Sequence, residues 1–269
     1  MNIGAVSGAT AMRRVAACQI RDVIRSRWLM AYGLFFLVLT DALLRFGGGG
    51  SRVLLSMVDI VLFVVPLVTI VLGTTYLYNA REFVELILAQ PVRRRAVFGG
   101  LFLGLVLPLT LAFAAGVGIP FALRGVAADG AALAAVLGIG ALLTLVFGAL
   151  ALLIAIRAED RLRGVGLAVG VWLVTAVVYD GVVLLLAAIF ANQPLERPML
   201  GAMLANPVDL ARVILLLRFD GAALLGYTGA VFQQFFGGAR GTAIALGALL
   251  LWVIGPLVLA SRAFARKDF

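Results

Sequence analysis

The stretch that decides the fold is VLLSMVDIVLFVVPLVTIVLGTTYLY, residues 53–78, in which Asp59 is the only charged residue. A helix needs ~20 mainly apolar residues to cross the ~30 Å hydrocarbon core of a bilayer. Residues 53–78 exceed that length. The stretch therefore predicts a helix that spans a membrane.

Five further runs of this kind make the whole chain an all-α membrane protein. The 269 residues are 64% hydrophobic and only 13% charged, whereas soluble domains are ~45–50% apolar and ~25% charged. This composition excludes an ordinary soluble enzyme. We expect a single transmembrane domain over residues 1–269, with six transmembrane helices at residues 28–46, 53–78, 98–123, 132–156, 165–191 and 242–260.

The basic residues set the orientation. Most of the 22 Lys and Arg residues fall in the segments on the side of the spans that includes both termini. Cytoplasmic loops carry the excess of Lys and Arg, so both termini are expected in the cytoplasm of a bacterial inner (plasma) membrane protein. Topology and membrane lipid account for the net charge of +9, and no nucleic-acid partner is expected.

Three scarce residue types limit the chemistry. The chain has no His, a single Cys (Cys18) and a single Lys (Lys267). No metal site and no catalytic residue are therefore expected. A phosphate-binding P-loop needs Lys followed by Ser or Thr, but Asp268 follows Lys267. If ATP is used, another chain must bind it.

Residues 11–27 predict an N-terminal helix at the membrane interface. At 100° per residue, apolar and basic side chains fall on opposite sides, as in interfacial helices. The alternative is a basic leader that only sets topology. The apolar side holds Met12, Ala16, Ile20 and Val23, and the other holds Arg14, Arg21 and Arg25.

The segment NAREFVELILAQPVRRRAVF, residues 79–98, predicts a short cytoplasmic helix over 80–90 that Pro91 ends. A helix with exposed apolar side chains between two spans is a docking surface for a soluble partner. The alternative is a solvated loop whose basic run only stops transfer. The candidate docking residues are Arg81, Glu82, Phe83, Glu85, Leu86, Gln90, Pro91 and Arg93.

The outer segment 192–240 is too long for a simple turn. Asn206 and Pro207 open the stretch NPVDLARVILLL with a typical helix start. Asp209 lies near that N-terminus, where a carboxylate interacts favourably with the helix dipole. The apolar run at 224–236 is shorter than a span, which predicts a re-entrant or interfacial helix.

Three carboxylates fall inside the predicted spans: Asp41, Asp59 and Asp180. Each costs ~2.5–3.5 kcal/mol on insertion scales, so each should face a partner, a cavity or the interface. Ion pairs Asp41–Arg45 and Asp59–Arg52 at the outer ends of the first two spans are one explanation. A translocation path is the other, and Asp180 is its best candidate because it has no partner in its own span.

Three stretches resemble the permease subunits of ABC-2-type exporters, and most of all the NosY-type branch. They are REFVELILAQPVRRRAVFGG, NPVDLAR and the terminal SRAFARKDF. The second fits the NP-x-D-x-x-R pattern of that branch at Asn206, Pro207, Asp209 and Arg212. The resemblance covers nearly the whole chain.

The resemblance implies a permease dimer whose cytoplasmic coupling helices, between spans two and three, bind an ATPase dimer that holds ATP and magnesium. With six spans and no internal repeat, we expect a homodimer. The NosY-type branch also implies a periplasmic accessory protein and export of a sulfur- or copper-related species for maturation of a copper enzyme. The alternative is a mechanotransmitter that passes the ATPase stroke to a periplasmic partner without moving substrate. An intramembrane enzyme would need a second carboxylate facing Asp180, and an ion channel would need a filter signature.

Overall fold

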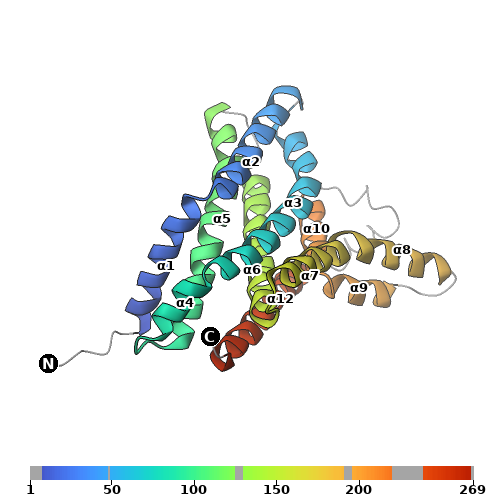
Figure 1. Cartoon of the computed structure of the whole chain (residues 1–269). Coiled ribbons are helices and arrows are strands. Elements are labelled where there is room, and N and C mark those ends of the chain that lie inside the picture. Colours follow the sequence, from blue (N-terminus) through green and yellow to red (C-terminus); the bar gives the residue numbers. More distant parts are fainter. Residues whose placement is uncertain (1–7, 48, 125–129, 191–195, 220–238, 268–269) are drawn as a thin grey trace.

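The computed structural model describes residues 8–47, 49–124, 130–190, 196–219 and 239–267, and within these ranges every regular element is a helix (Figure 1). The expected all-α fold is confirmed. The helices are α1 (Gly8–Ile24), α2 (Arg27–Phe46), α3 (Gly50–Asn79), α4 (Arg81–Leu88), α5 (Arg94–Arg124), α6 (Gly130–Arg157), α7 (Arg161–Leu173), the π-helix η1 (Val174–Val178), α8 (Tyr179–Ile189), α9 (Glu196–Leu204), α10 (Pro207–Arg218) and α12 (Ala239–Arg266).

Six helices in the described ranges are long and apolar enough to span a membrane, as predicted. Five correspond to α2, α3, α5, α6 and most of α12. The remaining span, Arg161–Leu186, is the fifth along the chain and consists of α7, η1 and most of α8. The turn between α2 and α3 uses Gly49 at a φ of 136°, a conformation that favours glycine.

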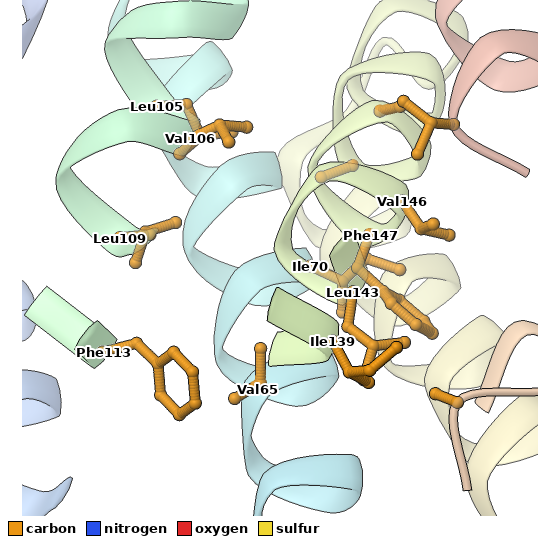
Figure 2. Close-up of a cluster of buried hydrophobic side chains, with 14 of the residues drawn as sticks. Val65, Ile70, Leu105, Val106, Leu109, Phe113, Ile139, Leu143, Val146 and Phe147 are labelled. Carbon is orange, nitrogen blue, oxygen red and sulfur yellow. The ribbon is translucent and has the colours of Figure 1, made fainter. Parts of the chain in front are cut away.

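Helix α6 lies at the centre of the bundle and packs against α3, α5 and α12. The core between α3, α5 and α6 is made of fully buried aliphatic and aromatic side chains (Figure 2). The Phe113 ring of α5 lies directly against Gly140 of α6, where a Cβ would clash with it. Such close packing around small residues is typical of membrane helices.

Helix α1 packs along the first part of α5. A Cβ on Gly100 would lie 2.7 Å from Val15, and one on Gly104 would lie 2.5 Å from Gln19, so these glycines let the two helices approach closely. Buried Gln19 accepts a 2.7 Å hydrogen bond from the Tyr76 hydroxyl of α3. The arginines of α1 are exposed, as its sequence predicted. Contact with a membrane interface stays a prediction.

The start of α1 and the end of α12 lie at the end of the bundle that carries α4 (Figure 1), and this end is called the α4 end below. The turn between α2 and α3 lies at the opposite end. The predicted re-entrant run at 224–236 lies entirely within residues 220–238, outside the described residues.

Candidate functional site

Helix α4 is a short element held against the bundle by one buried side chain. Val84 is fully buried, while Glu82 occupies the first turn, where a carboxylate is favourable. The helix ends at Leu88, three residues before Pro91. The predicted helix at 80–90 therefore exists, although it is shorter at both ends.

The outward face of α4 is amphipathic. Leu86 is 71% exposed, and Glu82 and Glu85 are also exposed. Phe83 is partly buried and packs against the core. The two large apolar side chains among the candidate docking residues therefore differ, since Leu86 is available to a partner and Phe83 packs partly against the bundle. Gln90, Pro91 and Arg93 are exposed in the following turn.

The base of α4 is tied to the connection between α6 and α7. Arg81 donates a 3.2 Å hydrogen bond to the Ala158 carbonyl, and its guanidinium lies 4.6 Å from the centre of the Tyr78 ring. The Tyr78 hydroxyl donates to the same carbonyl at 2.9 Å. Of the three residues in these contacts, only Arg81 was a candidate docking residue predicted from the sequence.

A second tie joins the C-terminal end of α12 to α5 and α6. Arg94 donates to the Lys267 carbonyl at 2.7 Å, and Lys267 Nζ donates to the Ile156 carbonyl at 2.7 Å. Burial lowers the pKa of Lys267 below its ordinary value. These contacts join the ends of four long helices around α4. A force on α4 therefore acts on a connected layer rather than on a loose loop.

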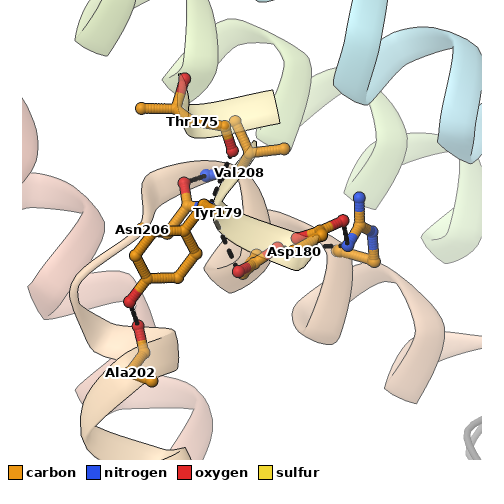
Figure 3. A network of polar contacts seen from close by, with 8 residues as sticks. Thr175, Tyr179, Asp180, Ala202, Asn206 and Val208 are labelled. Carbon is orange, nitrogen blue, oxygen red and sulfur yellow. Dashed lines mark hydrogen bonds and ion pairs between the residues drawn. The ribbon is translucent and has the colours of Figure 1, made fainter. Parts of the chain in front are cut away.

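A second candidate site consists of Thr175, Asp180, Asn206, Asp209 and Arg212, and is called the outer polar cluster below because three of its residues come from the segment 192–240 that the sequence predicts to be outer. Asn206 caps α10 by accepting from the Val208 amide at 3.1 Å, as its place before Pro207 predicts. The Asn206 side chain is almost fully buried. Its amide Nδ2 donates to the Thr175 carbonyl at 2.8 Å and to Asp209 at 3.1 Å (Figure 3).

Arg212 joins the two carboxylates of this cluster. Its Nη1 lies 2.7 Å from Asp180 Oδ2 and 3.1 Å from Asp209 Oδ1. Asp209 is 10% exposed, while Arg212 and Asp180 are about one-third exposed. Asp180, which has no partner in its own span, thus finds one on α10, 32 residues along the chain. The NP-x-D-x-x-R stretch and the intramembrane carboxylate form one site.

The cluster meets the fifth span where that span is irregular. The π-helix η1 interrupts the α-helical path between α7 and α8, and Asn206 binds the Thr175 carbonyl within it. The Tyr179 hydroxyl next to it donates to the Ala202 carbonyl at 2.6 Å (Figure 3). Because π segments frequently occur at functional sites, this part of the fifth span is a candidate point of movement.

Burial and then the neighbouring Asp180 carboxylate raise the pKa of Asp209 to about 7. Arg212 and Asn206 act in the opposite direction. The unfolded chain would lose this proton near its ordinary pKa of ~4. The folded protein therefore holds a proton that the unfolded chain lacks, and the stability linked to it is lost as pH rises through about 7.

The remaining predicted carboxylates lie elsewhere. Asp41 pairs with Arg45 at 2.9 Å, as predicted, and also accepts a 2.7 Å hydrogen bond from Arg124 of α5. Asp59 is exposed on α3, and among the described residues it forms no ion pair with Arg52 or any other cation. The expectation of an Asp59–Arg52 pair was therefore wrong.

Comparison with known proteins adds a family and two relatives. The family model described as ABC-2 family transporter protein matches residues 41–269. A protein of Pseudomonas aeruginosa named "Probable ABC transporter permease protein NosY" is 29% identical, over 94% of this chain and 97% of its own length. A protein of the same name from Stutzerimonas stutzeri is 26% identical over the same shares.

Proposed function

Because this chain belongs to the ABC-2 family of transporter proteins, as a NosY-like permease subunit of an ABC transporter, we propose that it couples ATP hydrolysis to the export of a substrate. In this proposal a separate ATPase dimer hydrolyses ATP, and its movement reaches the membrane spans through α4. Permeases of this family work with an ATPase subunit. The α4 end faces the cytoplasm in this proposal, and the outer polar cluster faces the other side.

The observation that carries the proposal is the arrangement around α4. Leu86, Glu82 and Glu85 present an exposed apolar and acidic face, which suits a groove lined with apolar and basic groups. Behind that face, Arg81 and Tyr78 fix α4 to the connection between α6 and α7. Nucleotide-driven motion of a docked ATPase would therefore move α3, α6 and α7 together.

A mechanotransmitter is the second candidate function, and the outer polar cluster favours it. Asp180, the best path candidate from sequence, is held by Arg212. Asp41 is held by Arg45 and Arg124. Ion pairs of this kind fix helices relative to each other. They therefore suit a subunit whose helices move together as a rigid unit and displace an outer partner.

The finer parts of the proposal extend from the NosY-like relatives. We propose a homodimer, a periplasmic accessory protein, and a sulfur- or copper-related cargo for maturation of a copper enzyme. No group of three or more His, Cys, Asp or Glu side chains able to hold a metal occurs in the described part of the chain.

Replacing Asp180 by Asn separates the two candidate functions. The amide still accepts a hydrogen bond from Arg212, so assembly with the ATPase should survive. If Asp180 takes part in export, ATP hydrolysis stimulated by the permease in vesicles should change by about two- to thirtyfold, the range of coupling effects of ~0.5–2 kcal/mol.

The control for this experiment is Asp59→Asn, which removes an exposed carboxylate without an ion pair in the described residues. It should leave hydrolysis unchanged. If the Asp180→Asn complex hydrolyses ATP at the wild-type rate, Asp180 has no part in the export mechanism, and mechanical transmission is favoured. Loss of the assembled complex would make Asp180 a structural residue.

A further inference from the structure

Three neighbouring cavities, together called the groove below, follow one another along α2 and α3 and share lining residues. The first, of about 280 Å³, lies where α1, α3, α4 and α5 meet. It shares Trp28 and Leu72 with a second cavity of about 480 Å³. The second shares Phe35 and Val64 with a third of about 460 Å³. The groove exists because α2 packs mainly against α5 and touches α3 much less.

The two parts of the groove differ in chemistry. At the α4 end, polar side chains from α1 and α3 line the first cavity, and these include Asp22, Gln19, Thr75 and Asn79. Farther along, the second cavity is lined by aliphatic and aromatic residues throughout. The first cavity, called the polar chamber below, is polar on one side only, where these side chains lie among apolar ones. A cavity with one polar side that continues into an apolar groove matches an amphiphile with one headgroup and a long hydrocarbon chain.

The first two cavities together match the length of one leaflet of a bilayer, and the third, which reaches Asp59, lies beyond them along α3. Between Asn79 and Val64, which mark the two ends of the first two cavities, α3 rises by about 22 Å at ~1.5 Å per residue. Half of a ~30 Å hydrocarbon core is ~15 Å, which leaves room for a headgroup at the polar end. Trp28 is 72% exposed at the junction, a residue type enriched at membrane–water interfaces.

The charge of the polar chamber selects the headgroup. Asp22 forms no ion pair in the described parts of the chain, and the residues that line the first cavity include no Lys or Arg. Arg21 lies beside Asp22 on α1 and Arg25 follows the end of that helix; all three side chains are exposed, but only Asp22 lines the cavity. The chamber is therefore complementary to a cation that also donates hydrogen bonds.

We propose that the groove binds one phospholipid with a primary ammonium headgroup, such as phosphatidylethanolamine, from the leaflet at the α4 end. The ammonium binds Asp22, and an acyl chain lies between α2 and α3 over Leu72, Val68 and Val64. Phe83 of α4 also lines the polar chamber. The bound lipid therefore supports α4 from behind.

The proposal is tested by native mass spectrometry of the purified permease–ATPase complex, loaded with equal amounts of phosphatidylethanolamine and phosphatidylglycerol. The ammonium of phosphatidylethanolamine can donate a charge-assisted hydrogen bond to Asp22, and phosphatidylglycerol has no such donor, so we expect the wild type to prefer phosphatidylethanolamine by at least about tenfold. Asp22→Asn should remove that preference and keep the total bound lipid. Equal binding of the two lipids by the wild type, or no bound lipid, would overturn the proposal.

A second variant tests the apolar groove. Leu72 lines both cavities at their junction, so Leu72→Trp should fill the passage and reduce bound lipid at least about tenfold. Leu173→Trp, on the exposed face of α7, is the matched control and should retain it. Val68→Trp, which fills the apolar part alone, serves if Leu72→Trp does not assemble. Undiminished lipid in the assembled Leu72 or Val68 variant would contradict the proposed site, and a helix of a second permease copy would be the better occupant.

Discussion

Phe83→Ala combined with Leu86→Ala is expected to release the ATPase from the permease without preventing membrane insertion. Truncation of apolar anchors at interfaces costs ~2–4 kcal/mol, which corresponds to a loss of about 30- to 700-fold in affinity. Leu86 should account for most of this loss because it is 71% exposed and its truncation leaves the core intact. Leu86→Ala alone should weaken binding at least about tenfold.

The measurement is titration of the ATPase onto permease reconstituted in nanodiscs. The matched control is Phe46→Ala with Leu123→Ala, which removes side chains that are 88% and 81% exposed at the opposite end of the bundle. The control should bind as the wild type does. Equal affinity of both double variants would place the docking site outside α4.

Arg212→Leu is expected to produce the largest loss of stability in the outer polar cluster. It leaves Asp180 and the buried Asp209 without their shared cation. Removing one partner of a buried ion pair costs ~3–5 kcal/mol. Because Asp180 and Arg212 are about one-third exposed, solvent screens part of this cost, and ~2–3 kcal/mol is expected.

The defect of Arg212→Leu should also grow with pH. The pKa of Asp209 is raised to about 7 by its burial and by Asp180. Below that pH Asp209 is protonated and neutral, so the absence of Arg212 costs the folded protein less stability. Melting temperatures between pH 5 and pH 8 should therefore diverge increasingly from the wild type. Adding Asp209→Asn should restore most of the stability and remove the pH trend. A defect that is the same at all pH values would contradict this assignment.

The spans could be predicted because length and apolarity are local properties of the chain. Residues 53–78 lie within α3, and the six helices of suitable length correspond to the six predicted spans. The end of the short helix before Pro91 was predictable from another local feature, because proline disfavours continuation of a helix.

The polar contacts between distant segments could not be predicted in this way. Arg212 reaches Asp180 from a helix 32 residues away, and no spacing within one span reveals such a pair. The predicted Asp59–Arg52 pair was wrong because both residues lie on α3, seven positions apart, and Asp59 is exposed. One signal was available: a charged Arg212 beside the apolar run VILLL needs a partner once α10 packs against the bundle.

The contacts behind α4 were missed for another reason. Tyr78, Arg94 and Lys267 donate to backbone carbonyls, and a carbonyl has no side-chain signature in the sequence. The sequence therefore predicted the short helix and its exposed face, and missed the hydrogen bonds that join this helix to the spans.

Site-specific photo-crosslinking shows directly whether the ATPase contacts this permease at α4. Leu86 is replaced by benzoylphenylalanine in the assembled complex, and the same replacement at Leu123 is the control. We expect a crosslink to the ATPase from position 86, altered in yield by ATP, and none from position 123. No crosslink from position 86 in a complex that still hydrolyses ATP would contradict this expectation.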